Sequence, residues 1–185
     1  MVTPLEIFVF LAAALGIVFA SRASLLAPRA HGFYRFFAWE IILALVMLNL
    51  RSWFHNPFSW HQILSWLLLT ASLFPVFLGM RMLRLAGKPD SQRVEVPLVG
   101  IEKTTALVTT GIYRYIRHPL YASLLLLTWG VFFKEPGWLN GLLALAATGF
   151  LLVTAWVEER ENLAYFGEAY RVYMRHTRRF IPVVF

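Results

Sequence analysis

The sequence contains no cysteine. A disulfide framework, a thiol nucleophile and a thiolate metal site are therefore excluded. The histidines do not recur at metal-ligand spacings such as H-x-x-x-H, and no P-loop, G-x-S-x-G or H-E-x-x-H pattern occurs. No G-x-G-x-x-G pattern follows a strand, which excludes a common dinucleotide-binding fold. We therefore expect no metal ion in this protein.

Charged residues are also scarce, at 15% of the 185 residues, whereas apolar residues make up 59%. Soluble proteins average about 45–50% apolar residues, so this chain has too much apolar surface for a soluble core. Each bilayer crossing needs roughly 20 residues at a rise of 1.5 Å per residue. The apolar runs predict an all-α, integral-membrane helical bundle with about five transmembrane helices, at residues 4–21, 36–50, 62–80, 120–133 and 138–157.

The last two predicted spans are separated by only four residues, 134–137, which predicts a tight antiparallel helical hairpin. Beyond them, apolar and aromatic residues recur at helical spacing with charged residues between them. This pattern predicts an amphipathic, cytoplasmic helix over residues 158–174 and involves Leu163, Phe166, Tyr170 and Tyr173.

The longest polar connection lies between the third and fourth predicted spans. Within it, residues 88–91 have the composition of a turn and residues 94–97 that of extended chain. No internal repeat or low-complexity linker occurs. We therefore interpret the chain as one membrane domain in three parts: N-terminal spans (1–84), a connecting segment (85–118), and the hairpin with the C-terminal helix (119–185).

Basic residues outnumber acidic ones by 17 to 10. In a membrane protein such an excess reflects topology and anionic headgroups more often than nucleic acid, so we expect membrane lipids and no nucleic acid as partners. Only Arg51 and Lys134 fall in connections on one side of the predicted bundle. The positive-inside rule therefore predicts an external N-terminus and a cytoplasmic C-terminus, in the inner membrane if the source is bacterial.

Residues 108–121 place arginine, histidine and tyrosine directly before the fourth predicted span. Gly111 permits a turn that a residue with a Cβ would resist, and Pro119 fits the first turn of the following helix. The pattern therefore predicts a turn, a polar cluster and then a membrane helix. The cluster could face a soluble cofactor and a lipid at once. An interfacial belt that only anchors the protein is an equally good interpretation of these residue types.

Glu158 and Glu159 lie at the cytoplasmic end of the fifth predicted span. The short hairpin aligns the two spans, so these carboxylates should lie at the depth of Arg117 and His118. Together they could bind an ammonium, hydroxyls or a sulfonium-bearing cofactor, or they could form a structural ion pair. Glu40, inside the second span and close to Arg35, is likewise a functional candidate, part of an intramembrane pair or a side chain that snorkels toward the membrane surface.

The distribution of polar residues limits the function classes. Most alternating-access transporters use two repeats, which this chain is too short to contain. A channel would need polar residues through the bilayer, whereas here they collect at one face. An interfacial enzyme and a structural subunit of a larger complex both remain open.

Two motifs resemble a known family. Gly111, Tyr113, Arg117, His118, Pro119 and Tyr121 match the G-x-Y-x-x-x-R-H-P-x-Y pattern of the isoprenylcysteine carboxyl methyltransferase and phospholipid methyltransferase superfamily. The C-terminal block of that superfamily, E-E, F-G-x-x-Y-x-x-Y and R-F-I-P, is similar to Glu158, Glu159, Phe166, Gly167, Tyr170, Tyr173 and residues 179–182. The resemblance covers roughly residues 106–182 in the same order, and the N-terminal half matches only in hydropathy.

The resemblance implies an S-adenosylmethionine-dependent methyltransferase whose lipophilic acceptor enters sideways from the membrane. It implies that the donor pocket is lined by Leu107, Val108, Gly111, Tyr113, Arg117, His118, Tyr121, Glu158 and Glu159. Among these we expect Arg117 and Glu159 to be the catalytic pair. Many members have a histidine where this chain has Thr105, so that imidazole contact is missing.

The reaction itself is left open at two points. Related sterol reductases use a nicotinamide cofactor, so a membrane reductase is an alternative. Methyl transfer from a sulfonium needs alignment and exclusion of water, without a metal or a covalent intermediate. A carboxylate acceptor needs a cation to hold it, whereas an amine acceptor needs a base. The sequence offers both kinds of group, so O-, N- and S-methylation all remain possible.

Overall fold

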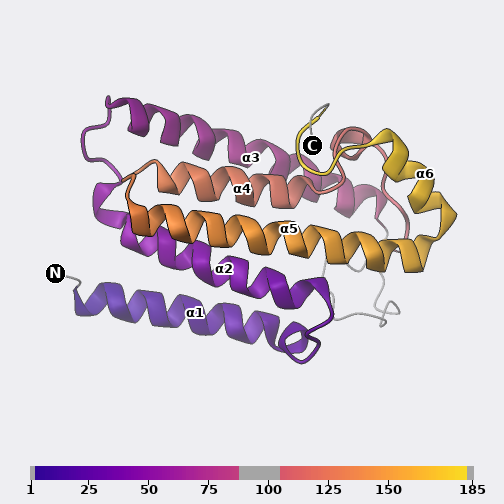
Figure 1. Cartoon of the computed structure of the whole chain (residues 1–185), viewed down its shortest axis with the longest axis horizontal. Coiled ribbons are helices and arrows are strands. Elements are labelled where there is room, and N and C mark those ends of the chain that lie inside the picture. Colours follow the sequence, from indigo (N-terminus) through magenta and orange to yellow (C-terminus); the bar gives the residue numbers. More distant parts are fainter. Residues whose placement is uncertain (1–2, 88–104, 183–185) are drawn as a thin grey trace.

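The computed structural model describes residues 3–87 and 105–182, and Figure 1 shows these residues as one elongated helical bundle. The regular elements in this part of the chain are helices, with one isolated β-bridge. Two short 3₁₀-helices are η1 (Leu50–Ser52) and η3 (Gly111–Arg114). The α-helices are α1 (Pro4–Leu25), α2 (His31–Leu48), α3 (Trp60–Ala86), α4 (Pro119–Phe132), α5 (Trp138–Phe166) and α6 (Glu168–His176).

Four helices, α1, α2, α3 and α5, are long and apolar enough to cross a membrane, and α4 is apolar but shorter. Many large apolar side chains point outward, including Phe8, Leu15, Phe74 and Leu142. A bilayer solvates such side chains, whereas water would not. The prediction of an all-α membrane bundle is therefore confirmed.

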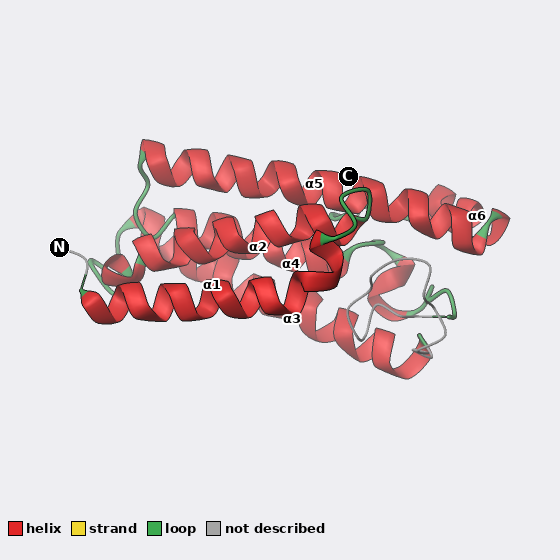
Figure 2. Cartoon of the chain, turned by 90° about the horizontal axis from the view of Figure 1, so that it is seen from below, coloured by secondary structure: helices red, strands yellow, loops and turns green. Residues whose placement is uncertain are grey.

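Small residues allow the helices to approach closely. Ala38 on α2 and Ala147 and Ala155 on α5 are completely buried in the core. Between α3 and α4, a Cβ added at Gly130 would lie 2.9 Å from the Leu69 side chain. Tight contact through small residues is how helices associate where lipid removes the hydrophobic driving force. Helix α1 packs on α2 at the edge of the bundle (Figure 2).

The predicted hairpin is present, and its connection is bound by a buried lysine. The ammonium of Lys134 donates to the Gln62 side-chain oxygen at 3.0 Å and to the Trp53 carbonyl at 3.2 Å. It also lies 3.5 Å from the centre of the Trp66 ring. Cation–π contact and hydrogen bonds together stabilise a buried charge. This end of the bundle is therefore joined across α3, η1 and the hairpin.

The predicted helix over residues 158–174 was wrong in its boundaries. Helix α5 continues without a break from the membrane span to Phe166, because no residue between 158 and 166 disfavours helix. The break comes at Gly167, whose φ of 59° lies in the left-handed region. The separate amphipathic helix is therefore α6, shorter than predicted. The expected turn at 88–91 and extended chain at 94–97 lie outside the described residues.

Candidate functional site

The polar cluster lies at the end of the bundle where α5, α6 and the segment before α4 meet. Its first part is the turn at Gly111, whose φ is 61°. A Cβ at this position would lie 2.5 Å from the sulfur of Met82 on α3. The backbone conformation therefore favours glycine, and a Cβ would in addition require the Met82 side chain to move. The turn buries Tyr113, whose carbonyl accepts a 2.7 Å hydrogen bond from the Tyr173 hydroxyl on α6.

The C-terminal segment, residues 177–182, runs alongside the residues that precede α4. The backbone nitrogen of Arg117 donates to the carbonyl of Arg178 at 2.8 Å, and that of His118 to the carbonyl of Arg179 at 3.0 Å. In return, Arg178 donates to the carbonyl of Tyr115 at 3.1 Å. These bonds make the isolated parallel bridge and hold the end of the described chain against the start of α4.

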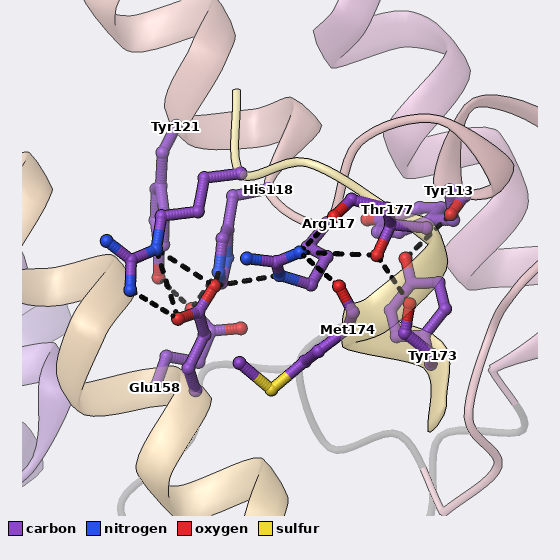
Figure 3. Close-up of polar contacts among 10 residues, drawn as sticks. Tyr113, Arg117, His118, Tyr121, Glu158, Tyr173, Met174 and Thr177 are labelled. Atoms are coloured by element: carbon purple, nitrogen blue, oxygen red, sulfur yellow. Dashed lines mark hydrogen bonds and ion pairs between the residues drawn. The ribbon is translucent and has the colours of Figure 1, made fainter. Parts of the chain in front are cut away.

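Glu159 is the centre of a buried ionic cluster that includes Arg117 and His118, two residues whose polar contacts can be followed in Figure 3. Its carboxylate accepts from Arg117 Nε at 2.8 Å and from Arg179 Nη2 at 2.9 Å. His118 Nε2 lies 3.4 Å from the same carboxylate. Arg117 also donates to the carbonyl of Thr177 at 2.5 Å. Only 3% of the Glu159 side chain is exposed, so its charge is compensated by these partners and not by water.

Glu158, its neighbour on α5, has different surroundings. Its side chain is 27% exposed, and it accepts a 2.5 Å hydrogen bond from the Tyr121 hydroxyl. The Tyr121 ring stacks on His118 at 5.4 Å between ring centres. The two adjacent glutamates therefore differ in their surroundings: Glu159 binds arginine side chains inside the protein, and Glu158 presents its carboxylate to a pocket.

This pocket, which we call the polar pocket, lies between α5, α6 and the segment before α4. Most of the site residues predicted from the sequence line it: Leu107, Val108, Tyr113, Arg117, His118, Tyr121 and Glu158. Gly111 and Glu159 are outside the lining, although Glu159 binds Arg117, which lines the pocket. Thr105 is outside it too, and its nitrogen donates to the carbonyl of Gly87 at 3.2 Å.

The pocket also has a wall that sequence reasoning missed. His31, at the start of α2, lines it together with Glu161 of α5. Glu161 accepts from the His31 backbone nitrogen at 2.9 Å, and its other oxygen lies 2.6 Å from Nδ1 of the imidazole. Glu161 could have been found, because it lies one helical turn after Glu158. No sequence pattern pointed to His31 as a pocket residue, since it is remote in sequence from both motifs.

Aromatic side chains complete the polar pocket. Phe166 and Tyr170 line it with their rings stacked 6.4 Å apart, and Tyr173 lies beside them. Burial raises the pKa of both tyrosines well above the usual range, so their hydroxyls stay protonated. The cavity volume is about 90 Å³, which is less than the 300–1,000 Å³ of typical small-molecule sites. A nucleoside-sized ligand would therefore have to widen the pocket or extend out of it.

A second hollow, which we call the apolar groove, lies between α3, α4 and α5 and has a volume of about 640 Å³. Its lining is apolar apart from Thr148. Ala122, Leu126, Trp129 and Phe133 line it along one side of α4. These positions span roughly 16 Å of helix at 1.5 Å per residue. The groove therefore runs from the polar end of the bundle toward the hairpin connection.

The model of the phospholipid methyltransferase family matches residues 60–169, more than half of the chain. Methanethiol S-methyltransferase of Mycobacterium tuberculosis is 37% identical over 71 residues, which is 38% of this chain and 28% of that protein. Methanethiol S-methyltransferase 2 of Bradyrhizobium diazoefficiens is 38% identical over 77 residues, 42% of this chain and 29% of that protein.

A third relative, methanethiol S-methyltransferase of Pseudomonas sp. (strain GM41(2012)), is 29% identical over 93 residues. That match covers 50% of this chain and 33% of the relative. The chain thus spans about a third or less of the length of the curated relatives it matches. No solved structure gives a significant match.

Proposed function

The chain belongs to the phospholipid methyltransferase family, and from this premise we propose that it transfers a methyl group from S-adenosylmethionine to a lipophilic thiol. The donor would bind in the polar pocket and the apolar part of the acceptor in the groove. One observation carries the proposal: a pocket with carboxylates and aromatic rings adjoins an apolar groove at one end of a membrane bundle.

The pocket residues fit the chemistry of the donor, which has an ammonium, a carboxylate, ribose hydroxyls and an aromatic base. Glu158 and Glu161 can accept hydrogen bonds from the ammonium and the hydroxyls. Phe166 and Tyr170 offer ring faces to the base and to a sulfonium. Arg117, which also lines the pocket, carries a guanidinium that can bind the donor carboxylate.

The relatives' names favour a thiol over the carboxylate and amine that also fit the sequence, because the matched proteins are named for methanethiol. S-adenosylmethionine supplies a sulfonium methyl group, which passes to the acceptor sulfur as the donor sulfur keeps the bonding electrons and becomes a neutral thioether. Glu158 would take the thiol proton, with the Tyr121 hydroxyl that donates to it as a relay, since the thiolate is the nucleophile. The groove would exclude water and hold the alkyl group.

Arg117 and Glu159 have supporting roles in this proposal. Glu159 fixes the guanidinium groups of Arg117 and Arg179, and Arg117 in turn holds the end of α6 through Thr177. Arg117 also lines the polar pocket, so it can contact the donor directly, whereas Glu159 would act as a positioning residue. The excess of basic residues at this end favours its placement on the cytoplasmic side.

The proposal is tested with the purified chain in lipid nanodiscs and a donor with a radiolabelled methyl group. 1-Butanethiol, 1-butanamine and butanoic acid serve as acceptors of equal carbon number. We expect label in methyl butyl thioether and little in the amine or ester products. Transfer only to the amine or the acid would overturn the thiol assignment.

Calorimetry separates the competing cofactor classes. We expect S-adenosylmethionine and its demethylated product to bind, and reduced nicotinamide dinucleotide not to bind. Lys134→Met is the matched control, because it removes a buried charge at the opposite end of the bundle and should leave donor affinity unchanged. Binding of the nicotinamide alone would support the reductase alternative and contradict the proposal.

A further inference from the structure

The wall between the polar pocket and the apolar groove consists of few side chains. Phe180, in the C-terminal segment, lines the groove and is only 4% exposed. Its ring centre lies 6.0 Å from that of His118, which lines the polar pocket. His118 stacks in turn on Tyr121, while Ala122, the next residue on α4, faces the groove. The rings of His118 and Phe180, one lining each hollow, therefore lie between the polar pocket and the apolar groove.

The position of Phe180 is fixed by hydrogen bonds that the preceding residue, Arg179, makes through both its backbone and its side chain. The Arg179 carbonyl accepts from the His118 backbone nitrogen, and the Arg179 side chain binds Glu159 through three contacts of 2.9–3.2 Å. Phe180 itself belongs to the buried core cluster with Ile116 and Leu151. The ring is therefore a fixed part of the wall and not a side chain on a loose end of the chain.

We propose that Phe180 is a specificity-determining residue that selects acceptors unbranched at the carbon next to the sulfur. This inference rests on the proposed function, because an acceptor sulfur in the polar pocket and an alkyl chain in the groove must be joined beside Phe180. The carbon bonded to the sulfur would then lie next to the Phe180 ring. Additional methyl groups there would meet the Phe180 ring, whereas a longer straight chain would extend along the groove.

The expected size of this preference follows from the effect of one methyl group on binding in an apolar pocket. An extra or missing methylene changes specificity about 10- to 200-fold. 1-Butanethiol and 2-methyl-2-propanethiol are isomers, so their carbon number is the same and only their branching differs. We expect the wild type to prefer the linear isomer at least about 10-fold in kcat/KM. Phe180→Ala should shift that ratio about 10-fold or more toward the branched isomer.

The test measures this ratio in wild type, Phe180→Leu, Phe180→Ala and Leu64→Ala. Leu64 lines the groove near the start of α3, toward the hairpin connection and away from the carbon next to the sulfur, so its truncation should leave the ratio of the two isomers unchanged. Phe180→Leu retains an apolar side chain of intermediate size and should shift the ratio in the same direction but less. It also keeps the test valid if Phe180→Ala fails to fold.

A second readout requires no methyl transfer. Binding of the two methyl thioethers that the isomers would yield is measured without donor by competition against a fluorescent alkyl probe. The same shift in preference with Phe180→Ala supports the inference even if the wild type proves inactive on thiols, which would refute only the proposed function. An unchanged preference in both Phe180 variants, or an equal shift in Leu64→Ala, would overturn the role of Phe180.

Discussion

Glu158 and Glu159 provide the sharpest test, because they are adjacent, chemically identical and differently placed. We consider the substitution of each by glutamine, which keeps the size of the side chain and removes its charge. Glu159→Gln leaves the side chain of Arg117, which is 8% exposed, without its carboxylate. Removing one partner of a buried ion pair costs about 3–5 kcal/mol. Since Arg117 keeps its bond to the Thr177 carbonyl, we expect the lower end, about 3 kcal/mol.

For a chain of this size, a loss of that magnitude lowers the unfolding midpoint by about 6–12 °C. Glu158→Gln should behave in the opposite way. Its side chain is 27% exposed and the amide oxygen can still accept from Tyr121, so stability should change by less than about 0.5 kcal/mol. Donor affinity should fall about 10- to 150-fold, because the variant loses one hydrogen bond to a charged group, which contributes about 1.5–3 kcal/mol to binding.

The assay pairs thermal unfolding in detergent with calorimetric titration of S-adenosylhomocysteine. Arg22→Ala is the control for loss of a charge, because Arg22 bonds to the Phe19 carbonyl on α1, away from the polar pocket. Equal destabilisation by both glutamine variants, or full donor affinity in Glu158→Gln, would refute the different roles assigned to the two residues.

The remaining predictions concern other parts of the bundle. Gly111→Ala should lower the free energy of unfolding by about 1–2 kcal/mol, because alanine is strained in the left-handed backbone conformation of this position. Adding Met82→Ala should remove the side-chain contact but not this backbone strain, and thermal unfolding of both variants would show the difference. Lys134→Met should lower thermal stability by about 1–3 kcal/mol through orphaned acceptors without changing donor affinity. Tyr173→Phe should lose about 1 kcal/mol with its bond to the Tyr113 carbonyl. Folding raises the pKa of Tyr173, so the stability that its protonated hydroxyl contributes is present below about pH 10 and decreases as the pH rises above that value. In a pH series of thermal unfolding, Tyr173→Phe should therefore lose less stability at alkaline pH than the wild type does.

Much of the fold follows from the sequence because membrane helices depend on local composition. The apolar runs were sufficient to predict the bundle and the hairpin at 134–137. The sequence does not predict the end of α5 correctly, because the change from apolar to charged residues at Glu158 resembles the end of a helix. Charge does not interrupt a helix, whereas Gly167 does.

The candidate site was predicted in part for a related reason. Motif residues such as Tyr121 and Glu158 do line one pocket. Sequence could not separate Glu158 from Glu159, because consecutive helical residues point about 100° apart and only packing shows which direction is buried. His31 could not be found at all, since its contact with Glu161 spans 130 residues and depends on how α2 packs against α5.

The central claim is that the polar pocket binds the methyl donor beside the end of the apolar groove. An experimental structure with S-adenosylhomocysteine bound would test it most directly. We expect ligand density between Glu158, Glu161 and Tyr170, with the sulfur on the side nearest Phe180. Density elsewhere on the protein, or a polar pocket left empty at saturating ligand, would contradict the account.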